Sequence, residues 1–382
     1  MKIVIDATFN PHGGSLVHLK EFILNLKNRV SPGNLVIYIK KENISLIGTE
    51  TLKGCDIKIA TLPSVNRFFW ILWLQFVLPF KIMLLKYDIL FSPGNISPIL
   101  KTTKIKAQWV ATIGPFYKMV YLGLNFKDRM LLHLNKLLML FSMMSSNMVI
   151  HESKYSLDLF TSKYKLKKDQ QYLIECGKSN FFYHDLDKDK VSNKSILEIQ
   201  PEDLLCVSHF YPYKNLERMV LAFDAFLKKS DTKNVKLLMC GLPTFKSYYF
   251  DIVSLTKQLK YPDNIVFVGG VDQVDLRYAY SRCKFMIFPS LCESSGYTLI
   301  EAMSCGTALI ATKLTAIPYT CEDAALYFDA FDVNDLCQKM QILNSDVTLQ
   351  TELRKKSIER KDSLLNFNES ADLFHKYLSQ LI

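Results

Sequence analysis

Glu293 and Glu301 are the residues of this chain whose type and spacing best suggest chemistry, since seven residues separate them around a predicted loop and helix start. The apolar run Phe285–Phe288 predicts a strand, Thr298–Cys305 predicts a helix, and another apolar run follows Gly306, so the stretch is typical of a βαβ unit. Ligands bind at the carboxyl edge of such a sheet. Two carboxylates there can accept hydrogen bonds from vicinal hydroxyls, the groups that a ribose or a hexose offers.

Two glutamates at this spacing would ordinarily be solvated surface residues, but the residues around them favour a ligand site. The stretch P-S-x-x-E-x-x-G-x-x-x-x-E-A-M-x-C-G closely resembles the E-x7-E signature of glycosyltransferase family 4, the retaining GT-B enzymes among glycosyl transferases group 1. The resemblance implies that Glu301 binds the ribose of a nucleotide-sugar, and that Glu293 lies beside the transferred sugar and acts in catalysis. It implies an α/β fold, GT-B, in which two Rossmann-like αβα domains face each other across a cleft.

His209 and Lys214 extend the resemblance to a second motif. The family carries an Arg and, five residues later, a Lys, and both bind the donor diphosphate; here His209 stands at the Arg position and Lys214 at the Lys position. The resemblance makes Lys214 a catalytic and donor-binding cation. A nearby dianion would favour the protonated form of His209, although a histidine is a weaker and pH-dependent substitute for a guanidinium.

The resemblance adds further candidate donor-binding residues. Backbone amides of the loop before the predicted helix could reach a phosphate, and the donor-binding positions there are Ser295, Gly296, Tyr297, Thr298 and Leu299. Val271, after a predicted strand, is a candidate contact to the nucleotide base. Gly13 and Gly14 precede a predicted amphipathic helix, and glycines at a helix N-terminus let a backbone approach an anion. An ordinary strand-to-helix turn is the alternative for this pair.

One departure from the family concerns its usual sugar-contacting histidine, whose place is taken by Ala111 or, less well, Gly114. Neither side chain can donate a hydrogen bond. The departure keeps open a second hypothesis, a non-catalytic GT-B subunit that binds a nucleotide-sugar or a partner enzyme. An NAD-dependent dehydrogenase is disfavoured, because no G-x-G-x-x-G follows the first predicted strand.

A chain of 382 residues with 49% hydrophobic residues predicts two domains with separate cores. We expect an acceptor-binding domain over 1–175, a nucleotide-sugar-binding domain over 176–365, and a C-terminal helix over 366–382 that packs back on the first domain. The polar segment 163–193 is the expected linker. The nine cysteines show no C-x-x-C pair, which indicates a reducing cytoplasm, and no signal peptide is predicted at the N-terminus.

Charge is unevenly distributed. Residues 1–180 hold 24 Lys and Arg against 11 Asp and Glu, whereas the whole chain has a formal charge of +10. A basic first half attracts anions, such as an acidic membrane surface or a phosphorylated acceptor. Nucleic acid is not expected as a partner, because no nucleic-acid-binding motif accompanies the charge.

Two apolar segments stand out in this half. Residues 67–85 predict a buried or interfacial helix rather than a spanning one, and with the surrounding lysines they suggest attachment to an anionic membrane surface. Residues 127–144 predict a helix whose Met and Leu stripe belongs to the core, and His133 within it is expected to be structural.

Taken together, the residues and the resemblance predict a retaining glycosyltransferase of the hexosyltransferase type. It would move a sugar from a UDP- or GDP-sugar to a glycan or a lipid-linked acceptor in bacterial surface polysaccharide synthesis. The expected location is the cytoplasm, at the inner face of the plasma membrane. Neither a cofactor nor a metal is expected, because cations and loop amides would stabilise the leaving diphosphate.

Overall fold

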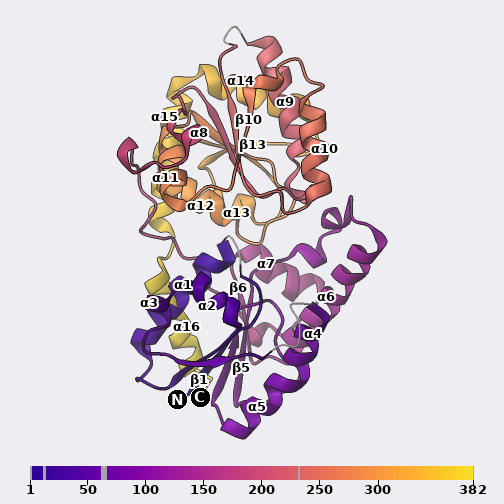
Figure 1. Ribbon diagram of the computed structural model, residues 1–382, viewed down its shortest axis with the longest axis vertical. Coiled ribbons are helices and arrows are strands. Elements are labelled where there is room, and N and C mark those ends of the chain that lie inside the picture. The colour runs from indigo at the N-terminus through magenta and orange to yellow at the C-terminus, as the bar shows by residue number, and fades with distance from the viewer. Residues whose placement is uncertain (1, 12–13, 62–66, 231–232, 382) are drawn as a thin grey trace. The chain divides into compact units, whose positions relative to one another are not determined.

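The computed structural model describes residues 2–11, 14–61, 67–230 and 233–381, and it divides into two compact units (Figure 1). The first unit comprises Met1–Phe116, Leu124–Gly177 and Leu365–Ile382, and the second comprises Tyr117–Gly123 and Lys178–Leu364. Each unit has a parallel sheet flanked by helices, so the predicted α/β class with two Rossmann-like αβα domains is confirmed.

The sheet of the first unit is parallel, and its central strands are buried. Its strands, from one edge to the other, are β3 (Asp56–Ile59), β2 (Leu35–Ile39), β1 (Ile3–Ala7), β4 (Ile89–Ser92), β5 (Ile105–Val110), β6 (Met148–His151) and β7 (Gln171–Leu173). Strands β1, β2, β4, β5 and β6 are buried throughout, as expected for parallel strands covered on both faces. β7 lies within the expected linker 163–193, so that prediction was wrong for the residues up to Gly177. A three-residue strand is too short to produce a period that a sequence reading can detect.

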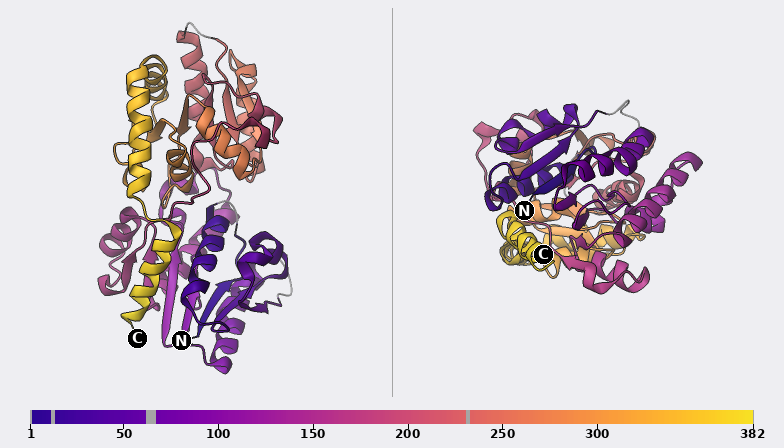
Figure 2. Two further views of the ribbon diagram at one scale, coloured as in Figure 1. Left: turned by 90° about the vertical axis from the view of Figure 1, so that its left-hand side faces the viewer. Right: turned by 90° about the horizontal axis from the view of Figure 1, so that it is seen from below.

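The helices of this unit are α1 (Gly14–Leu26), α2 (Lys41–Ile47), α3 (Thr49–Leu52), α4 (Arg67–Leu72), α5 (Leu78–Leu85), α6 (Phe126–Met144), α7 (Lys154–Asp158) and α16 (Phe367–Ser379). The C-terminal helix α16 packs against α1, and Figure 2 shows it in yellow alongside the first unit. Arg29 Nε lies 2.6 Å from Asp372 Oδ1, and the Phe374 ring lies 5.0 Å from the Phe22 ring. The end of the chain is therefore part of the first core.

The apolar segment 67–85 is helical throughout, with a π-helical turn at Trp73–Val77 between α4 and α5. By length and composition it could cross a membrane: its most apolar window has a mean hydropathy of 1.9, and only 33% of that window is buried in the protein. Helix α6 corrects a prediction, because its apolar stripe is not all core. Met130 is 59% and Met144 63% exposed, and amphipathic spacing alone does not distinguish a core face from an uncovered one.

The sheet of the second unit has the strand order of a doubly wound nucleotide-binding domain. From edge to edge its strands are β10 (Ile265–Gly269), β9 (Leu237–Cys240), β8 (Leu204–Val207), β11 (Phe285–Phe288), β12 (Leu309–Thr312) and β13 (Ala325–Phe328). The order reverses between β8 and β11, which are adjacent and parallel. The connections that leave these two strands run to opposite faces of the sheet, and ligands bind in the crevice at this point.

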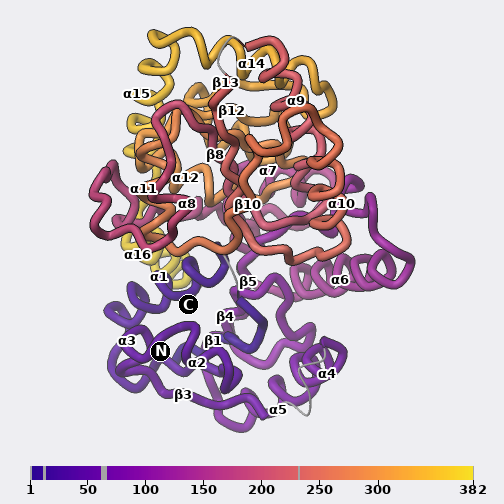
Figure 3. The backbone as a smooth tube through the Cα atoms, turned by 45° about the horizontal axis from the view of Figure 1, so that its top comes forward, coloured from indigo at the N-terminus to yellow at the C-terminus, as the bar shows by residue number. Residues whose placement is uncertain are grey.

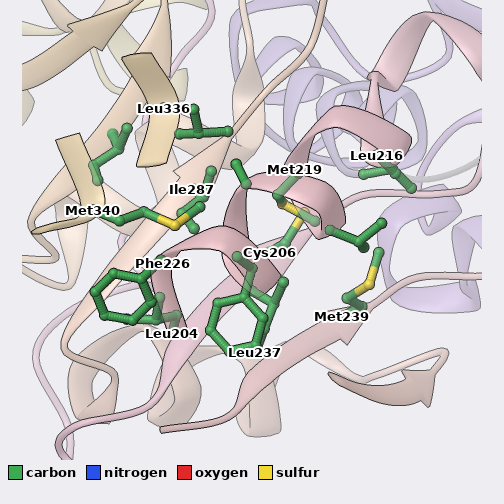
Figure 4. Close-up of a cluster of buried hydrophobic side chains, with 14 of the residues drawn as sticks. Leu204, Cys206, Leu216, Met219, Phe226, Leu237, Met239, Ile287, Leu336 and Met340 are labelled. Carbon is green, nitrogen blue, oxygen red and sulfur yellow. The ribbon is translucent and has the colours of Figure 1, made fainter. Parts of the chain in front are cut away.

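The helices of this unit are α8 (Lys194–Leu197), α9 (Leu216–Lys229), α10 (Lys246–Thr256), α11 (Gln273–Arg282), α12 (Tyr297–Ser304), α13 (Ile317–Cys321), α14 (Val333–Ser345) and α15 (Val347–Ser363). A core cluster joins β8, β9 and β11 to α9 and α14, with Leu204, Met219 and Met340 among its members (Figure 4). Helix α12 agrees within one residue with the predicted helix Thr298–Cys305. The strands and helices that lead to the loops at the carboxyl edge of this sheet are therefore held by a close-packed core.

Candidate functional site

The loops that follow β8 and β11 are bonded to each other at the point where the strand order reverses. Leu291 N–H donates to the Tyr213 carbonyl at 2.8 Å. Asn215, fully buried with φ of 58°, donates from Nδ2 to the carbonyls of Pro289 at 3.2 Å and Ala330 at 2.8 Å. Asparagine is one of the few residues that adopt this left-handed conformation readily. These bonds fix the two loops relative to each other and bring their side chains together.

Lys214 and Glu293 form an ion pair between these two loops. Lys214 Nζ lies 2.5 Å from Glu293 Oε1, and each side chain is only 15% exposed. Burial alone would lower the pKa of Lys214, but the Glu293 carboxylate, with smaller contributions from Tyr213 and Cys292, raises the pKa above the ordinary value of a lysine. The ammonium also lies 5.3 Å from the centre of the Tyr213 ring. Lys214 is therefore a fixed cation in a partly desolvated site.

Glu293 is hydrogen-bonded through its backbone to the loop that follows β12. Its backbone N–H donates to Thr315 Oγ1 at 2.9 Å, and Thr315 has φ of 54°. A β-branched residue in this conformation carries backbone strain, so the surrounding loop must hold it in place. The backbone of Glu293 is thereby positioned by a third loop at the carboxyl edge of the same sheet.

Glu301 lies on α12 and is bonded to Tyr280 of α11. Tyr280 Oη donates to Glu301 Oε2 at 3.0 Å, and the Tyr280 side chain is fully buried. Burial raises the pKa of Glu301 to about 7, although the tyrosine hydrogen bond opposes the shift. Burial and the nearby carboxylate raise the pKa of Tyr280 well above its ordinary value, so the phenol keeps its proton and remains a donor.

His209 follows β8 and is oriented by the backbone of the next loop. Leu242 N–H donates to His209 Nδ1 at 3.0 Å. A ring nitrogen that accepts a hydrogen bond carries no proton, so this geometry selects the neutral tautomer with its proton on Nε2. The predicted protonation of His209 beside a dianion stays a prediction, and an imidazolium would lose the Leu242 bond. His209 can still donate to a phosphate from Nε2.

The loop before α12 matches the prediction in part. Gly296 has φ of 78° at the residue before the helix, a conformation that glycine adopts without steric cost. Leu299 is a correction: its backbone N–H donates to the Gly296 carbonyl at 2.8 Å and its side chain is fully buried, so it offers no donor to a ligand. Tyr297 and Thr298 form the first turn of α12, and Ser295 is buried directly before Gly296.

The remaining predicted donor residues are placed as follows. Val271 is half-buried in the loop after β10. Gly14 is the first residue of α1 in the first unit, and Gly13 lies outside the described residues. The donor-site roles of these three residues therefore stay predictions.

Ala111, at the position expected for the family's histidine, follows β5 of the first unit. Its backbone N–H donates to Asn95 Oδ1 at 2.7 Å, and the N–H of Thr112 donates to the same oxygen at 2.9 Å. Asn95 has φ of 70° in the loop after β4. The side chain of Asn95 thus ties together the loops that leave β4 and β5, and no histidine side chain is supplied at this position.

A separate cluster in the first unit offers possible metal ligands. One ligand atom from each of His18, Glu152 and Cys176 lies within 4.8 Å of the others, and all three residues are buried. Burial lowers the pKa of His18 to about 4, so its imidazole is neutral. Trp109 Nε1 donates to Glu152 Oε1 at 3.0 Å, which already uses one carboxylate oxygen. These residue types suit zinc, but none of them belongs to the predicted donor site.

Sequence reasoning missed Tyr280, Thr315 and the bridging role of Asn215. The contacts of Tyr280 and Asn215 join residues 21 to 115 positions apart, and no local period marks them. The only available signal for Tyr280 was a polar ring in a helix just before the β11 strand.

Comparison with known proteins shows which family and which folds this chain resembles. Residues 187–361 match the family model described as glycosyl transferases group 1. The serotype-specific mannosyltransferase WbdA of Escherichia coli is 25% identical over 170 residues, which are 43% of this chain but only 20% of WbdA. The chain therefore spans a small part of that relative.

Among solved structures, sucrose-phosphate synthase from Thermosynechococcus elongatus superposes with a TM-score of 0.77 at 18% identity, covering 100% of this chain and 99% of that one. HepE of Anabaena, solved in complex with UDP-glucose, gives a TM-score of 0.74 at 12% identity, and both chains are covered completely. At such low identity these likenesses establish the fold alone. Residues 187–361 are similar to the glycosyl transferases group 1 family, and the chain as a whole has the GT-B fold.

Proposed function

We propose that this protein is a retaining glycosyltransferase that moves a sugar from a nucleotide-diphospho-sugar to a glycan or lipid-linked acceptor. The observation that carries the proposal is the set of charged groups at the reversal point of the second sheet. There the Lys214–Glu293 pair joins the loops after β8 and β11, and Glu301 is held on the following helix by Tyr280. A cation and two acceptors at this edge match the needs of a diphosphate, a sugar and a ribose.

Each residue has a distinct role in the proposed reaction. Lys214 neutralises the charge that develops on the leaving diphosphate, which is the kind of electrostatic stabilisation that dominates many transferases. His209 adds an Nε2–H donor to the same phosphates. Glu301 accepts hydrogen bonds from the ribose hydroxyls, and Glu293 orients the transferred sugar. The scheme uses no metal, so a chelator that abolished turnover would contradict it.

The donor and the pathway are part of the proposal. The name of the relative WbdA, a mannosyltransferase, favours mannose as the transferred sugar. The structure of HepE with UDP-glucose supports uridine as a candidate base of the donor. We place the protein in the cytoplasm and its reaction in bacterial surface polysaccharide synthesis. The nine cysteines are all free thiols and eight of them are buried, which agrees with a reducing compartment.

A donor screen tests the proposal. UDP-, GDP-, ADP- and dTDP-sugars would be compared by thermal shift and slow hydrolysis on the wild type, on Glu301→Ala and on Glu198→Ala. Glu198 is an exposed glutamate of the second unit, so it controls for the loss of one carboxylate. We expect one nucleotide-sugar to stabilise the wild type and Glu198→Ala but not Glu301→Ala, and to be hydrolysed. If no donor stabilises the wild type, the assignment of Glu301 and Lys214 is wrong.

A non-catalytic subunit is the second candidate, and two observations favour it. No histidine side chain stands at Ala111, and His209 replaces a fixed guanidinium. Stabilisation by a donor without hydrolysis or transfer to any acceptor, together with stimulation of a partner enzyme, would identify this second function.

A further inference from the structure

Two neighbouring helical segments of the first unit, the 67–85 helix and α6, expose apolar side chains on the side that faces away from the sheet. In the 67–85 helix, Trp70, Leu74, Leu78 and Ile82 are buried. The outward positions recur every three or four residues and are all exposed: Phe69, Leu72, Phe76, Phe80 and Met83. Phe76 is 70% exposed, which is unusual for a phenylalanine of a folded protein.

Helix α6 repeats this arrangement. Its inward side buries Asn135, Met139 and Met143. Its outward stripe also recurs every three or four residues and runs the full length of the helix, with the exposed positions Phe126, Met130, Leu134, Leu137, Phe141 and Met144. Phe126, at the start of the stripe, is 82% exposed. A stripe with this period is what a helix presents to an apolar partner.

The two segments are linked by a hydrogen bond. The Arg67 guanidinium at the start of α4 donates to Asn135 Oδ1 in the middle of α6 at 2.7 Å. The 67–85 helix precedes β4 and α6 precedes β6, and both strands lie on the same side of β1 in the sheet. Right-handed crossovers therefore place both helices on the same face of the sheet. In Figures 1 and 3, α4 and α6 lie on the side of the first unit opposite α3, and α5 follows α4 along the chain.

A short loop extends the apolar surface beside the 67–85 helix. Gln75 donates to the Ser97 carbonyl at 3.2 Å and accepts from Ile99 N–H at 2.9 Å. The next residue, Leu100, is 57% exposed. The outward stripes of the two segments, with Ile99 and Leu100, are called the two-helix face below.

The surroundings of the two-helix face are basic. Residues 61–150 contain ten Lys and Arg but only two Asp and Glu. Lys81 and Lys86 on one segment and Lys127 and Arg129 on the other are exposed. A second copy of this chain would set this basic surface against itself, and like charges across an interface oppose association. An anionic lipid surface is complementary in both respects, since it takes apolar side chains and attracts cations.

We propose that the two-helix face docks on an anionic lipid bilayer, with both helices lying in the plane of the interface. The exposed Phe, Leu and Met side chains enter the boundary between headgroups and acyl chains, while the flanking lysines contact the headgroups. The buried side of each helix stays packed on the sheet, so neither helix crosses the bilayer. This deepens the proposed function, because it would bring the enzyme to a lipid-linked acceptor.

Vesicle co-sedimentation tests the proposal without donor or acceptor, so its outcome is independent of transferase activity. The probes are vesicles of phosphatidylcholine with about one third phosphatidylglycerol, and vesicles of phosphatidylcholine alone. The apolar variants are Phe76→Ser/Phe80→Ser and Phe126→Ser/Phe141→Ser. Phe250→Ser is the matched control, because Phe250 is 61% exposed on α10 of the second unit. Circular dichroism verifies that each variant is folded.

We expect the wild type and Phe250→Ser to bind the anionic vesicles at low salt, and each apolar pair to weaken binding at least about tenfold. Lys81→Gln/Lys127→Gln should weaken binding about 25-fold, since each basic residue near the surface contributes about fivefold. Lys257→Gln, on an exposed lysine of the second unit, should change nothing. High salt should reduce the binding of the wild type.

Three results would overturn the proposal. The wild type could remain in the supernatant with anionic vesicles at low salt. It could bind equally well after both apolar pairs are replaced. Or the apolar variants could convert a dimer into a monomer in sedimentation velocity while no vesicle binding occurs, in which case the two-helix face is an interface between copies of this chain.

Discussion

The hydroxyl of Tyr280 should control the ionisation of Glu301 and, through it, the pH dependence of donor binding. Tyr280→Phe removes the hydrogen bond at 3.0 Å and leaves the ring in place. Hydrogen bonds to charged groups contribute about 1.5–3 kcal/mol, and one pKa unit corresponds to about 1.4 kcal/mol. The pKa of Glu301, about 7 in the wild type, should therefore rise by about one to two units in the variant.

The consequence for affinity follows from the ionised fraction. At pH 7.5, about three quarters of the wild type carries an ionised Glu301, but only about a quarter to a thirtieth of the variant does. Because the ribose hydroxyls bind best to the ionised acceptor, donor affinity should fall about 3- to 25-fold at this pH. At pH 9.5 both proteins are mostly ionised, and the difference should nearly disappear.

Isothermal titration calorimetry with the nucleotide-sugar found in the donor screen, at pH 6.5 to 9.5, measures this effect. Tyr278→Phe is the control, because it removes a second buried tyrosine hydroxyl from the same helix. An equal loss of affinity at pH 7.5 and 9.5 would show that Tyr280 affects donor binding only through the shape of the site and not through the ionisation of Glu301. No loss at any pH would refute the control of Glu301 ionisation by Tyr280.

Three further predictions concern the same unit. Burial raises the pKa of Glu301 in the folded state, so the stability contributed by its protonated form is lost as pH rises toward 7. Between pH 5.5 and 8 the free energy of unfolding of the wild type should therefore fall by about 2 kcal/mol relative to that of Glu301→Gln. Calorimetry measures this difference. Lys214→Ala should lower donor turnover at least about 100-fold while Lys246→Ala does not, and a smaller loss would remove Lys214 from the mechanism. Gly241→Ala would place a Cβ 1.9 Å from a backbone carbonyl oxygen and should destabilise the second unit by more than about 3 kcal/mol, whereas Gly269→Ala, with nothing within 4 Å, should cost about 1–2 kcal/mol in denaturant titrations.

The sheets were largely predictable because most of their strands, unlike β3 and β7, are short runs of buried apolar residues. The unit around Glu301 shows this most clearly, since α12 begins within one residue of its predicted start. The pairing of Lys214 with Glu293 was not predictable from local pattern, because 79 residues separate them. Only the resemblance placed both in one donor site, with Lys214 at the diphosphate and Glu293 beside the sugar.

The outward stripe of α6 shows a different limit. Burying a phenylalanine or methionine in a protein core, in a membrane or in a partner gains free energy by the same removal of apolar surface from water. A sequence period therefore marks a face that needs covering but does not say what covers it. Only the exposure of Met130 and Met144 in the folded chain separates this face from the core.

The Lys214–Glu293 pair accounts for how a cation can be kept ready in a site without substrate. A lysine as desolvated as Lys214 would by itself have its pKa lowered, and a neutral amine stabilises a leaving diphosphate poorly. Glu293 prevents this, because its carboxylate keeps the ammonium charged. In the proposed reaction the diphosphate then replaces that carboxylate as the partner of Lys214, and Glu293 becomes available to the sugar hydroxyls. The exchange leaves the net charge beside Lys214 negative throughout, so the cation persists from the resting enzyme to the leaving group without taking up a proton.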